Sequence, residues 1–205
     1  MSNRREFIFQ GLAVAAATGI ATQPALAAAP AGGDLEAGTS PVTRVVTDTR
    51  YDDSVAFARV LAGRGHALEP IEGDVTRLWL DRLEPALRAQ PAAIAGLTTE
   101  RSFLCLEMFA SSHGLRTVFH AEHLYLGGGH IEHSLRAPAE LLARAAPLAN
   151  PATHWPEHAA QLVAAYRTGR RPAPGRRLYA TRITRAVQPE VEALVSWVLA
   201  PLPRA

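Results

Sequence analysis

Between residues 43 and 125, short apolar or β-branched runs alternate with longer segments in which apolar residues recur every three or four positions. The short runs at 43–48, 66–71, 92–97 and 115–125 predict strands. The segments between them, at 53–64, 74–88 and 100–113, predict amphipathic helices. Because parallel strands need long crossover connections, this alternation favours an α/β fold with a parallel core.

The expected fold is a single α/β domain over residues 42–205, built in three layers and flavodoxin-like or Rossmann-like up to residue 126. Its sheet is expected to be mostly parallel, with residues 130–136 forming an antiparallel hairpin at the edge. The C-terminal part is expected to be helical, with helices near 138–146, 156–168 and 189–199 and a strand at 178–187. Apolar residues at helical spacing predict the last helix: Val191, Leu194, Val195 and Val198.

Composition excludes several kinds of chemistry. All 21 basic residues are Arg, and the absence of Lys rules out a Schiff base, covalent pyridoxal phosphate and a P-loop lysine. One cysteine, Cys105, cannot form an intrachain disulfide or a thiolate zinc knuckle. The formal net charge of +2 comes without a long basic stripe, which argues against a protein that binds nucleic acid.

The N-terminus has the three parts of an export signal: a charged start, an apolar run and a small-residue site ending at Ala27. The adjacent Arg4 and Arg5 resemble those of a twin-arginine (Tat) signal. An ordinary secretory signal and an uncleaved anchor are the alternatives, although the apolar run is shorter than the roughly 20 residues that span a membrane. We expect residues 1–27 to be a cleaved Tat-type signal and residues 28–41 a flexible leader. The mature protein is then periplasmic, without a stable membrane span.

A first candidate site follows from the expected fold. In a doubly wound sheet, ligands bind beyond the carboxyl ends of the strands where the strand order reverses. No glycine-rich phosphate loop follows the first strand, which argues against a dinucleotide. The strand ends are followed by helix N-termini that carry hydroxyl groups and arginines, and these groups suit a small organic anion. The same residues are also typical of ordinary helix caps. The carboxyl end of the second strand offers Asp74 and Thr76. The candidate binding residues are Asp48, Arg50, Thr98, Thr99 and Arg101.

A second candidate site is a histidine-rich hairpin, in which the pattern H-x-E-H stands at 120–123 and again at 130–133, with three glycines between the copies. If the glycines form the loop, His123 faces His133 across the two strands, with Cβ atoms about 5 Å apart. Two imidazoles this close could share Zn²⁺ or Cu²⁺ with a third ligand from elsewhere. The opposite face carries the other candidate ligands and two carboxylates: His120, His130, Glu122 and Glu132. The alternative is a half-exposed hairpin whose histidines are solvated and paired with glutamates.

Three segments, GDVTRLW at 73–79, IAGLT at 94–98 and LVSWVLAP at 194–201, resemble those of a group of uncharacterised exported bacterial α/β proteins that carry a Tat signal. The resemblance covers most of the mature chain. It implies export and a single α/β domain, and it assigns no activity and no catalytic residue.

These observations favour an exported periplasmic accessory or binding protein without catalytic machinery of its own. Its partner would be a co-exported protein subunit, such as an enzyme that holds a cofactor. One alternative is a small metal-dependent hydrolase or lyase that uses the histidine hairpin, with Glu122 or Glu132 as general base. Another is a binding domain for an organic anion. No cofactor is firmly implied, and Zn or Cu enters only with the hairpin.

Overall fold

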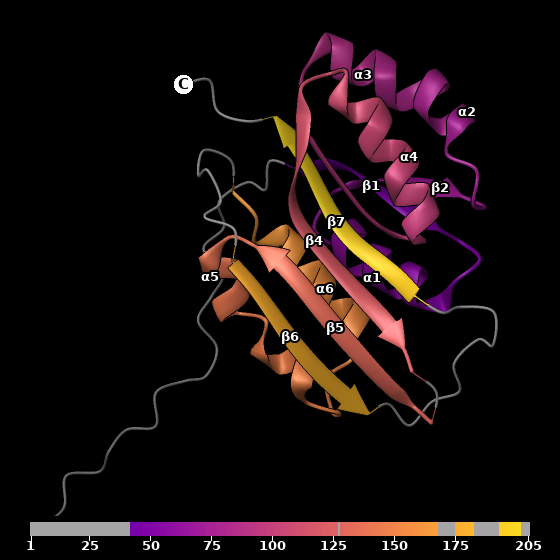
Figure 1. Ribbon diagram of the computed structural model, residues 1–205. Helices are drawn as coiled ribbons and strands as arrows, with labels where there is room; N and C mark the ends of the chain where they lie inside the picture. Colours follow the sequence, from indigo (N-terminus) through magenta and orange to yellow (C-terminus); the bar gives the residue numbers. More distant parts are fainter. Residues whose placement is uncertain (1–41, 127, 168–174, 183–192, 202–205) are drawn as a thin grey trace, which may run out of the picture. The chain divides into compact units, whose positions relative to one another are not determined.

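Seven strands of the described residues form one mixed sheet in the order β2-β1-β3-β7-β4-β5-β6 (Figure 1). The computed structural model describes residues 42–126, 128–167, 175–182 and 193–201, so the predicted signal and leader lie outside the described residues. The strands are β1 (Val42–Asp48), β2 (Ala67–Ile71), β3 (Ala93–Thr98), β4 (Leu115–Tyr125), β5 (His130–Ala137), β6 (Gly175–Arg182) and β7 (Ala193–Pro201). At the level of a mixed sheet with helices, the α/β prediction is confirmed.

The prediction of a mostly parallel sheet is wrong. The only parallel pairs in the described sheet are those that β1 makes with β2 on one side and with β3 on the other. The remaining described pairings are antiparallel: β3 with β7, β7 with β4, β4 with β5, and β5 with β6. The expected hairpin is present as β4 and β5, but β6 lies beyond it, so the hairpin does not form the edge of the sheet.

The strand β7 stands where a helix over 189–199 is predicted, so the helical C-terminal part is also a partly wrong prediction. Residues 194–200 are all buried, with alternate side chains in the hydrophobic clusters of the two sheet faces. A central strand covered on both faces is apolar at nearly every position, and a short run of this kind also satisfies helical spacing. The strand predicted at 178–187 is present as β6 up to Arg182, and residues 183–192 lie outside the described part.

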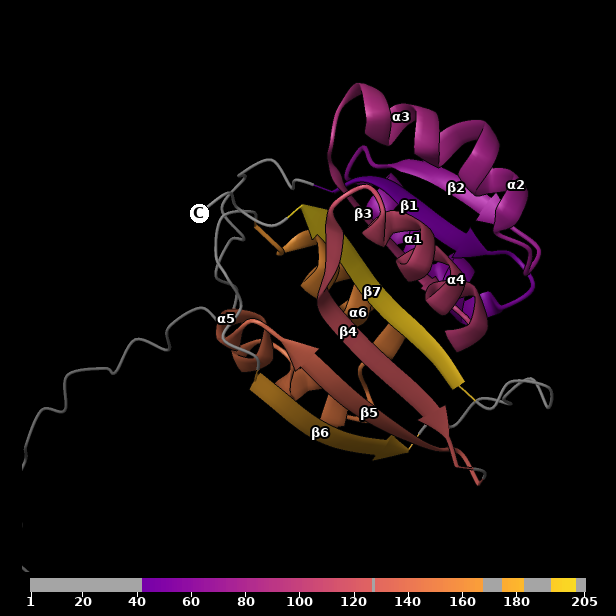
Figure 2. The ribbon, with the colours of Figure 1, turned by 45° about the horizontal axis from the view of Figure 1, so that its top comes forward.

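Helices lie against both faces of the sheet (Figure 2). One face is covered by α1 (Asp52–Ala62) and α6 (Trp155–Ala164), which pack side by side, and by α5 (Ala139–Ala143) and the 3-10 helix η2 (Ala146–Ala149). The other face is covered by α2 (Thr76–Leu78), the π-helix η1 (Trp79–Leu83), α3 (Glu84–Ala89) and α4 (Glu100–Ser111). The helices predicted at 138–146 and 156–168 are therefore present, in shorter form, as α5 and α6.

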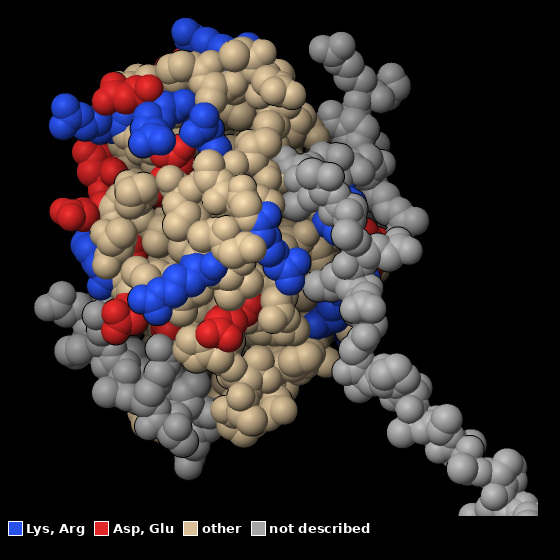
Figure 3. Space-filling view, turned by 180° about the vertical axis from the view of Figure 1, so that it is seen from behind, with Lys and Arg blue, Asp and Glu red and all other residues tan. Residues whose placement is uncertain are grey.

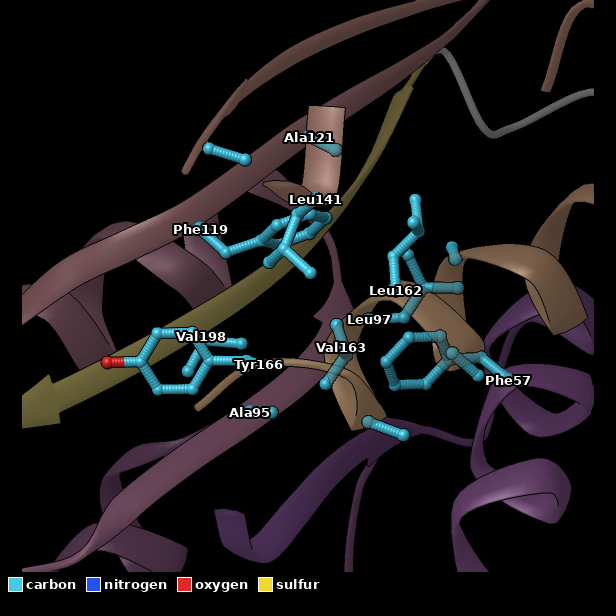
Figure 4. Close-up of a cluster of buried hydrophobic side chains, with 14 of the residues drawn as sticks. Phe57, Ala95, Leu97, Phe119, Ala121, Leu141, Leu162, Val163, Tyr166 and Val198 are labelled. Carbon is cyan, nitrogen blue, oxygen red and sulfur yellow. The ribbon is translucent and has the colours of Figure 1, made fainter. Parts of the chain in front are cut away.

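The larger hydrophobic core lies between the sheet and α1, α5 and α6 (Figure 4). This core includes Phe57 of α1, Leu162 of α6, Phe119 of β4 and Val198 of β7, and all four are buried. Removing such side chains from water is the main favourable term in folding. The core thus fixes α1 and α6 on the face of the sheet that also carries the histidine pair described below.

The smaller core, on the α4 side, depends on Trp197 of β7. Its ring lies across Gly96, its register partner in β3, and its indole N–H donates to Oγ1 of Thr98 at 3.1 Å. A Cβ atom on residue 96 would stand 2.6 Å from the Trp197 ring and 2.7 Å from the carbonyl oxygen of Val46. Glycine is required here because only a residue without a side chain lets the indole approach the backbone of β3.

Replacing Gly96 with Ala should lower the free energy of unfolding by about 1–3 kcal/mol, because the added methyl group overpacks the site. Urea unfolding followed by circular dichroism measures the change. Gly63→Ala is the matched control: its Cβ would meet only carbonyl oxygens at 3.5 and 3.6 Å, and its backbone is already right-handed helical. The control should keep or slightly raise stability. Equal stability of Gly96→Ala and the wild type would contradict the packing role of Trp197.

Candidate functional site

Two histidines of the β4–β5 hairpin face each other in the interior. His123 lies opposite His133 in the register, as the three-glycine loop predicts, and their Nδ1 atoms are 2.7 Å apart. Nε2 of His123 is 2.9 Å from Oγ of Ser196 in β7. Both histidines are completely buried. The alternative of a solvated hairpin is therefore wrong for this face.

Trp155, the first residue of α6, covers the histidine pair. The centroid of its ring system lies 4.2 Å from that of His123 and 5.6 Å from that of His133. Tyr125, two residues after His123 on β4, meets Trp155 edge-on and donates its hydroxyl to the carboxylate of Asp53 in α1. The pair is thus enclosed between the sheet and α6 by aromatic rings.

Burial keeps both imidazoles neutral at pH 7. Burial, with a smaller contribution from the nearby His158, lowers the pKa of His133 to about 4. It also lowers the pKa of His123 well below its ordinary value, and there His133 and His120 add to the effect. Since neither ring is charged, one of them must donate the N–H that lies between the two Nδ1 atoms.

The hydrogen-bond partners assign the positions of the protons. Nε2 of His133 is buried and has no hydrogen-bond partner among the described residues. A buried N–H without an acceptor is costlier than a buried lone pair without a donor. We therefore assign His133 as the donor between the Nδ1 atoms and the Nε2–H of His123 as the donor to Ser196. Nε2 of His133 is then a buried lone pair.

The structure does not bring the other two candidate ligands, His120 and His130, together. His120 lies opposite Arg136 and packs on Phe103 of α4, with ring centroids 5.1 Å apart. His130 begins β5 and lies opposite Arg182 of β6. Within the described residues, no three His, Cys, Asp or Glu side chains are placed to hold a metal ion together. A metal centre with a third protein ligand stays a prediction.

At the carboxyl end of β1, the candidate anion-binding residues bind each other. The buried carboxylate of Asp48 accepts two hydrogen bonds from Arg50, from Nε at 2.9 Å and from Nη2 at 2.7 Å. This bidentate pair raises the pKa of Arg50 further above its already high value. Asp48 accepts hydrogen bonds from both Nε and Nη2 of this guanidinium, so Arg50 does not present the two unoccupied terminal amino groups that suit an anion.

At the end of β3, Thr98 and Thr99 also have partners within the fold. Oγ1 of Thr98 accepts the indole N–H of Trp197, and Oγ1 of Thr99 accepts the backbone N–H of Ser102 as the cap of α4. Arg101 is exposed on α4 and takes no part in the hydrogen bonds described for these threonines. The geometry matches the alternative of ordinary caps, and the anion site stays a prediction.

A hollow of about 400 Å³ lies beside β2, at one edge of the sheet. The apolar part of its lining is formed by Pro70, Ile71 and Leu78. Its charged lining residues are Glu69, Glu72, Asp74, Asp81, Arg77 and Arg82. Figure 3 shows acidic and basic side chains lying close together on the side of the molecule where β2 and α2 lie. Asp74 is the one lining residue that the rule of strand ends singles out, and no sequence pattern predicts the hollow itself.

Glu69 is the unusual residue of the hollow. It is completely buried in the edge strand β2, where it forms ion pairs with Arg44 of β1 and with Nε of Arg82 at 3.0 Å. Arg82 lies in η1, a π-helical turn of a kind that is rare and often found at functional sites. Its side chain is 58% exposed, and its terminal amino groups have no partner within the described part of the chain. The sequence signals for this site are a carboxylate in the middle of a predicted strand and Asp74 just beyond the carboxyl end of that strand.

No family model matches this chain, and no curated protein or solved structure matches it either. Among the described residues, no helix is both long enough and apolar enough to cross a membrane. The function is therefore inferred from the geometry of the residues themselves.

The stability of the metal-free protein should fall as the pH drops from about 7 to about 4. The native histidine pair stays neutral in this range, whereas unfolded histidines take up protons near their ordinary pKa of about 6.5, so acid favours the unfolded state. The shift of His133 from 6.5 to about 4 alone corresponds to about 3 kcal/mol. Urea unfolding at a series of pH values measures this loss.

Carboxylates also titrate near pH 4, so the comparison with variants isolates the histidine contribution. His133→Leu should flatten the profile between pH 6.5 and 4.5, because the variant has no imidazole at this position to take up a proton on unfolding. An identical pH dependence in the wild type and in folded His133→Leu would contradict the assignment of a neutral buried pair.

Proposed function

We propose that the protein is an exported periplasmic binding protein without catalytic machinery of its own, with the hollow beside β2 as its ligand site. The observation that carries the proposal is the ion pair between Glu69 and Arg82. Oε2 of the buried carboxylate attracts Arg82 as an ion pair, with Nε 3.0 Å away but no hydrogen bond between them, and the guanidinium that lines the hollow keeps its two terminal amino groups. These amino groups form a planar fork of donors that suits a carboxylate.

Stability alone gives little reason to bury Glu69. Much of the Coulomb energy of a buried ion pair is lost to the desolvation of both charges, and an apolar pair of similar volume is often equally stable. Positioning gives the buried carboxylate a role, because its charge draws a long flexible side chain to the hollow before a ligand arrives. A guanidinium that is already oriented loses less conformational entropy on binding.

The lining favours a small ligand that carries charges of both signs. Arg82 can donate to a carboxylate, and Arg77 is paired with Asp81 at 3.5 Å. Glu72 and Asp74 repel a dianion and attract a cationic group. The volume of about 400 Å³ is at the small end of the range for ligand sites. An amino acid or a short peptide meets both conditions.

The other polar clusters support a role without catalysis. His133 is enclosed under Trp155, and Arg50 is bound to Asp48, so neither cluster offers a free base or a free cation to a substrate. The binding function would serve a co-exported enzyme subunit, for which this chain is the accessory protein. No observation favours the metal-dependent hydrolase or lyase over this role.

We also propose the finer description of the fold, a three-layer arrangement with a Rossmann-like or flavodoxin-like half. The order β2-β1-β3, with α1 on one face and α3 and α4 on the other, supports it. The hollow lies next to the carboxyl end of β2, at the edge of this half rather than between β1 and β3.

A thermal-shift screen of the twenty amino acids and of dipeptides should yield at least one compound that raises the melting temperature, because a ligand that binds only the native state stabilises it. Calorimetry then gives its Kd. Arg82→Gln should weaken binding about 10–100-fold, since a charge-assisted hydrogen bond contributes about 1.5–3 kcal/mol. Glu69→Gln should weaken it less, through loss of positioning.

Arg59→Gln is the matched control, because Arg59 is an exposed arginine of α1 outside the lining of the hollow. It should bind the same compound as tightly as the wild type. A screen without any binder, or a folded Arg82→Gln variant with wild-type affinity, would rule out the hollow as the ligand site.

Export by the Tat route is tested by replacing Arg4 and Arg5 together with Lys. The Tat route reads the arginine pair, whereas an ordinary secretory signal needs only positive charge. The double variant should lose its periplasmic pool in cell fractionation and accumulate as precursor. Normal amounts of periplasmic protein from this variant would instead identify an ordinary secretory signal.

A further inference from the structure

Two imidazole nitrogens converge in the interior without a third ligand. Nδ1 of His123 and Nδ1 of His133 point at each other across 2.7 Å, and the described residues offer no further His, Cys, Asp or Glu to complete a metal centre. Structural Zn²⁺ takes four ligands, and Ca²⁺ and Mg²⁺ take oxygen atoms. A cation for this pair must instead be satisfied by two nitrogen ligands, as Cu⁺ is in a linear arrangement.

Burial of the pair selects an ion of low charge. Moving an ion out of water costs free energy that grows with the square of its charge, so a monovalent ion is much less unfavourable here than Zn²⁺ or Cu²⁺. Both histidines are completely buried, and no carboxylate among the described residues pairs with either of them. The cluster therefore disfavours the divalent ions that the sequence pattern alone suggests.

Trp155 adds a favourable interaction for a monovalent cation. Its indole covers both imidazoles, with centroid distances of 4.2 Å to His123 and 5.6 Å to His133. A cation held within about 6 Å of an aromatic centroid is attracted by the electrons of the ring, and most strongly by those of Trp. The indole also shields the position between the Nδ1 atoms from water.

We propose that the His123–His133 pair binds one Cu⁺ ion between its two Nδ1 atoms, beneath the indole of Trp155. Metal–imidazole bonds are about 2 Å long, so a linear arrangement places the two nitrogens about 4 Å apart. The two nitrogens must then move apart by about 1.3 Å relative to the hydrogen-bonded pair. The proposal requires the two side chains to rotate by this amount while the strand register stays unchanged.

The surrounding hydroxyls fit the tautomers that the ion imposes. With the metal on Nδ1, each neutral ring carries its hydrogen on Nε2. His133 therefore moves its proton from Nδ1 to Nε2 of the same ring, and no proton is released. The Nε2–H of His123 keeps its bond to Ser196. Thr181 lies on the adjacent strand β6 on the same face of the sheet, and its Oγ1 is buried with no partner within the described residues. It is the candidate acceptor for the Nε2–H of His133.

Anaerobic titration of the purified protein with Cu⁺, against a chromogenic Cu⁺ chelator, tests the proposal. We expect one ion per chain, two nitrogen ligands in the X-ray absorption spectrum and a fall in tryptophan emission. A parallel titration with Zn²⁺ should show no binding at the histidine pair. Nuclear magnetic resonance of the wild-type protein with Ag⁺, a redox-inert monovalent substitute, should shift the imidazole ¹⁵N resonances of His123 and His133 and not those of His120.

Variants separate the two faces of the hairpin. His133→Phe should weaken Cu⁺ binding by at least about 100-fold, because even an outer partner of a metal ligand contributes 10–100-fold. Ser196→Ala should weaken it about 10-fold. His120→Gln, on the opposite face of β4, is the matched control and should bind like the wild type. Circular dichroism establishes that each variant is folded.

Three results would overturn the proposal. The first is the absence of a one-to-one Cu⁺ complex in the wild-type protein. The second is the absence of any Ag⁺-induced shift in the His123 and His133 resonances of the wild-type protein. This result would rule out the site even if the His133→Phe variant does not fold. The third is undiminished Cu⁺ affinity in a folded His133→Phe variant. None of these results bears on the hollow beside β2, which is tested with different ligands and different variants.

Discussion

The sheet is continuous because one strand, β7, pairs with β3 on one side and with β4 on the other. In the described residues β3 and β4 share no pairing, so the parallel half of the sheet meets the antiparallel half only through this strand. Each face of β7 belongs to a different core. Trp197 rests on Gly96 beneath α4, and Val198 lies beneath α1 and α6. Both helical faces of the domain therefore depend on the placement of β7.

The same strand completes the histidine cluster. Ser196 of β7 binds Nε2 of His123, and Trp155 of α6 closes the cluster from the other side of the rings. Three distant parts of the chain thus create one water-excluding environment, which is why the rings stay neutral. The hollow beside β2 is different in kind, because its charged groups are exposed to solvent and only Glu69 is buried. The two proposed sites accordingly suit different ligands, a soft cation in the interior and a small molecule with charges of both signs at the edge.

The features that could be predicted are those that local sequence determines. The strand at 43–48 and its neighbours follow from β-branched runs, and the three-glycine loop fixes the register that sets His123 opposite His133. The identity of β7 could not be predicted, because LVSWVLA satisfies both a buried strand and a helix until its partner strands are known. Predicting its place would require pairing Trp197 with Thr98, 99 residues earlier.

The candidate sites show the same limit. A rule about doubly wound sheets points to the ends of β1 and β3, but it does not say whether the charges there are free. Arg50 is bound to Asp48, a contact between near neighbours in a turn that no periodicity reveals. The ion pair of Glu69 with Arg82 joins a strand to a π-helical turn, and the sequence carries no mark of that turn. Pairing of charges depends on tertiary structure.

The central position of β7 has a consequence for how the protein is made. Until β7 has been synthesised, β3 and β4 have no partner between them, and their open backbone edges can pair with other chains. Sheets that depend on contacts between residues far apart in sequence also form slowly. A copy whose synthesis stops before β7 cannot join the two halves of its sheet. The Tat route proposed above moves proteins that are already folded. If this protein uses it, only copies that contain β7 can complete the sheet and be exported.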